Sequence, residues 1–203
     1  NAWNYLGANH TGLYRSRDAG ATWDFVLHTA GDHQRFHQQN IAYAPTSVSG
    51  GMAQRWYAGF PDNALYRSDN AGDSWSYMRS LSGHDELYGV AAHPTDADRL
   101  YVYSSQGLYA SGNGGATLTP LGNLPGGDVT SLDIAPNDPN DIFAAVRGQG
   151  LYHSTNGGQT FGLYRSFNIA SAFVHPTDRG QIYLIGQGGA SSLATSNGGQ
   201  SWV

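Results

Sequence analysis

Carboxyl groups are the side chains that hydrolysis of a sugar bond needs, and the candidates in this chain are Asp85, Glu86 and Asp128. A glycosidase uses two carboxyl groups, about 5 to 9.5 Å apart, one of which is protonated near neutral pH. Aspartate is also common in solvated turns, and Glu86 is the only glutamate among fifteen acids. We therefore expect no catalytic pair within this chain, and name these three residues as the candidates if it is a hydrolase.

Five other side chains are candidates for binding a partner. Arg35, Arg147 and Arg165 could attract acidic groups, because a guanidinium pairs with a carboxylate through charged hydrogen bonds. Tyr88 and His84 offer surfaces for stacking or hydrogen bonding. We expect all five to lie in loops at one face of the fold, where a ligand would be bound.

Metal and cofactor chemistry is not expected. His33 and His37 are four residues apart, a spacing that aligns two imidazoles only on a helix, whereas residues 28–39 have the pattern of a loop leading into a strand. No Ser-His-Asp arrangement, phosphate-cradling loop or nucleotide-binding fingerprint stands out. With no cysteine, the chain also has no disulfide, thiol nucleophile or zinc-thiolate site.

Composition favours an all-β protein. The chain has 203 residues, 28 of them glycine, no lysine, and 12% charged residues, which suits strands and turns better than helices. The formal net charge is -5 without a run of one sign, which argues against nucleic acid as the partner. No apolar run approaches the ~20 residues of a membrane span, so direct membrane insertion is not expected.

A ten-residue motif occurs five times. The copies are YRSRDAGATW (14–23), YRSDNAGDSW (66–75), YASGNGGATL (109–118), YHSTNGGQTF (152–161) and LATSNGGQSW (193–202). Their central glycines are 52, 43, 43 and 41 residues apart, a period typical of propellers and solenoids. We call these five segments the turn boxes.

The box residues predict a tight turn between two strands. The serine and the acid or amide can bond backbone amides, the glycine can adopt a positive φ, and the aromatic residue can pack against the next repeat. We expect a structural role for the following residues: Ser16, Asp18, Gly20, Trp23, Ser68, Asn70, Gly72, Trp75, Asn113, Gly115, Asn156, Gly158, Asn197, Gly199 and Trp202.

Each repeat contains four short apolar segments and no helical periodicity. The first ends in proline before each of the last four boxes: IAYAP, GVAAHP, SLDIAP and SAFVHP, ending at residues 45, 94, 136 and 176. A tyrosine-rich or aromatic segment, the LYRS-type segment and a last strand then follow. This pattern predicts a β-propeller of four-stranded antiparallel blades, whose most apolar strand lies innermost.

The predicted ring is incomplete. The sequence opens on a second strand, so the first of five blades lacks its inner strand, although propellers normally close by pairing strands from both termini. We expect one domain over residues 1–203, either as a fragment of a longer propeller or as a five-bladed ring closed by an unusual route or by a second chain.

The turn boxes resemble the Asp-box, or bacterial neuraminidase, repeat of sialidase-like propellers. The His-Pro-Thr-Asp element at 93–96 and 175–178 is most similar to sortilin-type, xyloglucanase-type and photosystem II assembly-factor propellers. The resemblance covers nearly the whole chain and implies the fold far more than the function. Leu118, Phe161 and Thr195 depart from the motif, which prefers tryptophan at the first two positions and serine at the third.

From these observations we expect a non-catalytic binding or scaffolding module that recognises a protein or glycan through its loop face. One alternative is a glycoside hydrolase of the sialidase or endoglucanase type. Another is an accessory propeller of a larger membrane or photosynthetic assembly. The resemblance favours an extracytoplasmic setting, secreted or periplasmic.

Overall fold

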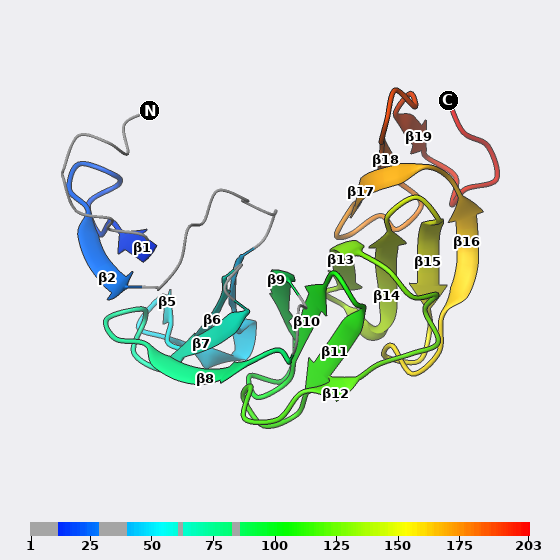
Figure 1. The fold of residues 1–203 in the computed structure, drawn as a ribbon. Coiled ribbons are helices and arrows are strands. Elements are labelled where there is room, and N and C mark those ends of the chain that lie inside the picture. Colours follow the sequence, from blue (N-terminus) through cyan, green and yellow to red (C-terminus); the bar gives the residue numbers. More distant parts are fainter. Residues whose placement is uncertain (1–11, 29–39, 61–62, 83–85) are drawn as a thin grey trace.

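The computed structural model describes residues 12–28, 40–60, 63–82 and 86–203. The described chain is all-β, and its strands form successive antiparallel sheets arranged along an arc (Figure 1). These sheets are the blades of a β-propeller, as the repeats predicted. No helix among the described residues is long and apolar enough to cross a membrane.

Three blades have all four strands, in sequence order from one edge to the other. The second blade contains β3 (Ile41–Tyr43), β6 (Trp56–Gly59), β7 (Ala64–Ser68) and β8 (Ser76–Ser80). The third contains β9 (Leu87–Ala92), β10 (Leu100–Ser104), β11 (Leu108–Ser111) and β12 (Thr119–Pro120). The fourth contains β13 (Val129–Ala135), β14 (Asp138–Val146), β15 (Gly150–Ser154) and β16 (Gly162–Ser166).

The first and fifth blades have fewer described strands. The first pairs β1 (Gly12–Arg15) with β2 (Asp24–His28), and its predicted second strand lies outside the described residues. The fifth contains β17 (Ile169–Val174), β18 (Ile182–Gly186) and β19 (Leu193–Thr195). The backbone of Val203 pairs with Ala194 through two hydrogen bonds of 2.8 and 2.9 Å, in the place of a fourth strand.

The longer spacing between the first two boxes includes a small hairpin. A 3₁₀ turn (Pro45–Ser47) leads into β4 (Val48–Ser49) and β5 (Met52–Ala53), which pair with each other. The indole of Trp56 donates a hydrogen bond to the carbonyl of Ala53 at 2.8 Å, which ties this hairpin to the second blade.

The hydrophobic core lies between neighbouring blades. Tyr57, Leu65, Leu87 and Val102 are fully buried where the second and third blades meet, and Phe143 and Ile182 belong to the cluster between the fourth and fifth. Because neighbouring blades bury their faces against each other, most inner-strand residues are apolar.

The turn boxes form the hydrogen bonds that their residue types predict. In the fourth box, Ser154 Oγ accepts from the amides of Asn156 and Gly158 and donates to Asn156 Oδ1. The five box glycines have φ between 79° and 92°, a region that favours glycine. In the first box, hydrogen bonds from Thr22 and Ser16 lower the pKa of Asp18 to about 2.

The large residues of the second and fourth boxes pack against the preceding blade rather than the next one. Trp75 packs with Leu13 and Leu27 of the first blade, and Phe161 belongs to the cluster formed with the third blade. The expectation that the box aromatic packs against the next repeat is therefore wrong for Trp75 and Phe161. No described residue precedes the first blade, and Trp23 is 62% exposed, its indole bonded to the carbonyl of Gly20 in its own turn at 3.1 Å.

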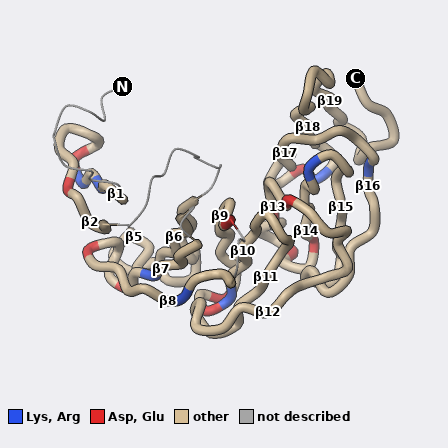
Figure 2. Tube along the Cα trace, in the orientation of Figure 1, with Lys and Arg blue, Asp and Glu red and all other residues tan. Residues whose placement is uncertain are grey.

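Charged side chains of both signs lie along the whole arc (Figure 2). Several arginines pair with acids of the same or a neighbouring blade, such as Arg55 with Asp69 at 2.7 Å and Arg179 with Asp141 at 2.9 Å. The described surface therefore has mixed charge, in keeping with the sequence.

Candidate functional site at the loop face

The connections between strands fall at two opposite ends of the blades. The turn boxes join third and fourth strands, and share one end with the turns between first and second strands. The other end, here called the loop face, contains the turns between second and third strands and the connections from one blade to the next. This is the face where the sequence predicted a binding site.

Tyr88, Asp128 and Arg147 meet at the loop face, where the third and fourth blades adjoin. The hydroxyl of Tyr88 donates to Asp128 Oδ2 at 3.2 Å, and Arg147 Nε lies 3.1 Å from the same oxygen in an ion pair. The guanidinium carbon of Arg147 stands over the Tyr88 ring, 5.9 Å from its centre. Three of the predicted site residues therefore form one contiguous cluster.

Burial and charge keep the Tyr88 hydroxyl protonated. Tyr88 is 5% exposed, and burial, followed by the nearby Asp128 carboxylate, raises its pKa to about 12. A phenol with this pKa is neutral over the physiological range and remains a hydrogen-bond donor to Asp128. The arrangement consequently fixes the carboxylate and, through it, the guanidinium.

Backbone and amide hydrogen bonds join the two loops that supply this cluster. The Arg147 amide donates to the carbonyl of Asp128 at 2.8 Å, and Gln149 Nε2 donates to the carbonyl of Gly126 at 2.9 Å. Rigid loops of this kind hold a binding residue in one orientation.

Arg147 retains an unused donor. Its Nε is buried and, although close to Asp128, is not aligned for a hydrogen bond with any described acceptor. The side chain as a whole is 38% exposed, so part of the guanidinium is open to solvent. An acidic or carbonyl group reaching this face would find a pre-positioned cation.

The other predicted binding and catalytic residues are not seen in this cluster. Arg35, His84 and Asp85 lie outside the described residues. Arg165 is on β16, the outer strand of the fourth blade, and its guanidinium stacks on Trp202 of the fifth box at 5.5 Å. The backbone of Glu86 pairs with Ser105: its carbonyl accepts the Ser105 amide, and its amide donates to Ser105 Oγ, each at 2.9 Å.

Sequence reasoning missed Asp133, which lies on the inner strand β13. Its Oδ2 accepts a hydrogen bond from the amide of Val174, on the inner strand of the fifth blade, at 3.0 Å. Burial raises its pKa to about 6 despite that bond and the charge of Arg179. The signal was present, because SLDIAP places an acid within an apolar strand.

The side chains of this cluster suit hydrogen bonding to an acceptor group rather than metal chemistry. Among the residues that the structure describes, no group of three histidines, cysteines or acids could hold a metal ion. Of the candidate hydrolase carboxyls, Asp128 is engaged by Tyr88 and Arg147. The chemistry that the geometry supports is recognition of an acceptor group by Arg147.

Solved structures that resemble this chain are β-propellers, which agrees with the fold described above. A GH74 xyloglucanase from Xanthomonas campestris aligns with 93% of this chain and 34% of its own, at TM-score 0.71 and 17% identity. An ancestral GH74 enzyme aligns with 81% of this chain and 23% of its own, at TM-score 0.63 and 22% identity. The chain thus spans about a quarter to a third of these enzymes.

YCF48, in a structure bound to a D1 peptide, aligns with 95% of this chain and 75% of its own, at TM-score 0.56 and 15% identity. At such identities these likenesses establish the fold and not the activity. No protein-family model matches the chain, and no curated protein sequence matches it.

Proposed function

We propose that this chain is a binding or scaffolding propeller that recognises an acidic segment of a protein partner through its loop face. The observation that supports this function best is the cluster of Tyr88, Asp128 and Arg147. Its guanidinium is oriented by a ring and a carboxylate, and the side chain is 38% exposed, so part of the guanidinium can contact a partner. Because the side chain is already ordered, binding loses less conformational entropy there than at a free arginine.

The similarity to YCF48 supports a protein partner, since that propeller was solved with a bound peptide. An interaction with a protein is also compatible with a role as part of a larger assembly, and with the Asp-box family that the turn boxes resemble. A secreted or periplasmic location remains part of this proposal.

The test is a peptide array incubated with three forms of the protein: the wild type, Arg147→Glu and Arg99→Glu. Arg99 is exposed in the turn between β9 and β10, at the opposite end of the blade, and controls for the change in net charge. We expect acidic peptides to bind the wild type and Arg99→Glu, and to lose binding to Arg147→Glu. Equal loss in both variants would mean that only net charge matters and would contradict the site.

A glycoside hydrolase is the second candidate, favoured by the fold shared with GH74 enzymes. In that case the described carboxyls at the loop face are Glu86 and Asp128. Hydrolysis of chromogenic β-glucans or sialosides that is abolished by Glu86→Gln or Asp128→Asn would replace the binding proposal with this one.

A further inference from the structure

The fifth blade has an exposed apolar face, here called the fifth-blade face. Phe173 on β17 and Tyr183 and Ile185 on β18 are 52%, 45% and 49% exposed. Ile182 and Leu184, which alternate with them along β18, are buried in the cluster with the fourth blade, so the exposed residues point to the opposite side. Phe173 and Tyr183 are paired across the two strands. A contiguous apolar patch of this kind marks an interaction surface.

The corresponding residues of the other blades are buried. Tyr183 has the same strand position and register as Tyr57, Tyr101 and Phe143 in the three preceding blades. These three residues are at most 4% exposed, because each belongs to a hydrophobic cluster formed with the blade that follows. The fifth-blade face therefore has the composition of an interface between blades, but no described blade covers it.

The first blade exposes residues that fit such a face. Trp23 is 62% exposed and Tyr14 is 40% exposed. Their equivalents in the second blade, Trp75 and Tyr66, belong to the cluster formed with the first blade. One end of the chain thus exposes the residue types that elsewhere cover the kind of face exposed at the other end.

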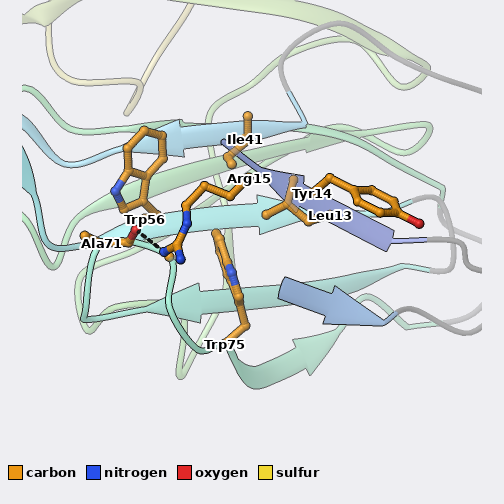
Figure 3. Close-up of a pocket in the computed structure, with 8 residues that line it drawn as sticks. Leu13, Tyr14, Arg15, Ile41, Trp56, Ala71 and Trp75 are labelled. Carbon is orange, nitrogen blue, oxygen red and sulfur yellow. Dashed lines mark hydrogen bonds between the residues drawn. The ribbon is translucent and has the colours of Figure 1, made fainter. Parts of the chain in front are cut away.

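A hydrogen bond that recurs at all four interfaces between described blades supports this match. The carbonyl before the box glycine accepts from a side chain of the preceding blade, at 2.5 to 3.4 Å. The four pairs are Arg15 Nη1 with Ala71, Arg67 Nη1 with Gly114, the Tyr101 hydroxyl with Gly157, and the Tyr164 hydroxyl with Gly198. Figure 3 shows the first of these bonds, from Arg15 to Ala71, beside Trp75.

The same acceptor is free in the first box. Ala19 occupies the position of the four carbonyls, is exposed, and receives no hydrogen bond from any residue that the structure describes. Tyr183 occupies the position of Tyr101, whose hydroxyl is one of the four donors. The two ends of the chain therefore supply a matching donor and acceptor.

A depression on the fifth-blade face lies where the next box would pack. Its volume is about 150 Å³, and Tyr183, Ala194 and Val203 are among the residues that line it. Ala194 holds the box position of Arg15 and Arg67, the two arginines that reach the next box. One water needs about 10 to 15 Å³, so the space left by the shorter side chain admits part of a large side chain.

We propose that two copies of this chain associate head to tail, with the first blade of one copy on the fifth-blade face of the other. Trp23 enters the depression beside Tyr183, and the Tyr183 hydroxyl donates to the Ala19 carbonyl. A second copy is the occupant because it carries the half of the interface that this face lacks. The first and fifth blades stand at opposite ends of the arc (Figure 1), so the two faces of one copy do not cover each other.

The test is sedimentation velocity of the chain across the micromolar range. We expect the mass of the wild type to rise above the 21.7 kDa of one copy as concentration increases. Trp23→Glu and Tyr183→Glu should each weaken self-association more than tenfold. Tyr77→Glu is the matched control, because Tyr77 is also exposed, at 58%, but lies in the second blade. This variant should associate as the wild type does.

A mixture of the two variants tests the head-to-tail arrangement. Trp23→Glu keeps an intact fifth-blade face, and Tyr183→Glu keeps an intact first blade. We expect the mixture to form a one-to-one complex with the affinity of the wild type, measured with a fluorescent label on one variant. Tyr183→Phe, which removes only the hydroxyl, should weaken self-association about two- to tenfold.

Three results would overturn the proposal. A wild type that stays monomeric at every concentration would do so, and would leave the two faces to further blades of a longer polypeptide. Self-association of Trp23→Glu as strong as that of the wild type would mean that two fifth-blade faces pair with each other. A mixture of variants that does not associate would exclude the head-to-tail contact. None of these results bears on peptide binding at Arg147, so the two proposals fail separately.

Discussion

Asp133 gives the sharpest prediction on stability. Its carboxyl lies between the inner strands β13 and β17, and burial raises its pKa from 3.8 to about 6 in the folded protein. The folded state therefore holds this proton more tightly than the unfolded state, so stability falls as pH rises from about 4 to about 6. At 1.36 kcal/mol per pKa unit, the loss is about 3 kcal/mol.

Asp133→Asn removes this titration while its amide oxygen can still accept from Val174. Between pH 4 and pH 7 we expect the wild type to lose about 2 kcal/mol of unfolding free energy relative to the variant, because part of the total loss has already occurred at pH 4. Urea denaturation monitored by fluorescence measures this difference. Asp178→Asn is the control of opposite sign, because hydrogen bonds from Gln181 and Gly180 lower the pKa of Asp178. Its stabilising contribution is present above the unfolded pKa and lost as pH falls. The reasoning would be refuted if the difference in unfolding free energy between the wild type and Asp133→Asn did not change with pH.

Three further substitutions test the contacts within and between blades. Ser154→Ala should lower the unfolding free energy by about 1 to 3 kcal/mol, because it leaves the buried Gly158 amide without its acceptor. Ser16→Ala, in the exposed first box, should lower it less, because water can replace the hydroxyl as acceptor for the Gly20 amide. Urea denaturation of both variants checks this order, and equal losses would contradict it. Asp141→Asn should weaken the pairing with Arg179 of the fifth blade and cost about 1.5 to 3 kcal/mol. Compared with the wild type, this variant should exchange backbone amide hydrogens faster in β17 and β18, and less so in β9 and β10. Unchanged exchange in β17 and β18 would argue against this contact as a link between blades.

The local parts of the fold could be predicted from the sequence. The inner strands stop before their prolines, and the serine, amide and glycine of each box make the turn that their chemistry favours. Such features depend on residues only a few positions apart, so a single sequence contains them.

The direction in which blades pack could not be predicted in this way. Trp23 and Trp75 look equivalent in the sequence, yet one is 62% exposed and the other packs against the preceding blade. The difference depends on which sheet lies beside each turn, and a local motif holds no information on that neighbour.

The candidate site was predicted in part for the same reason. Tyr88 comes from the third blade and Asp128 and Arg147 from the fourth, so their meeting depends on how these two blades adjoin. Arg165 also follows the repeat pattern, but the strand register pairs it with Leu151 and places it near Trp202 instead.

The most direct test of a binding loop face is chemical-shift mapping with the acidic peptide that binds most tightly on the array. The proposal predicts that the amide signals of Asp128, Arg147 and Gln149 shift on addition of peptide, and that the box amides of Gly72 and Gly158 do not. Shifts confined to the turn boxes, with Arg147 unaffected, would contradict it and place the binding surface at the opposite end of the blades.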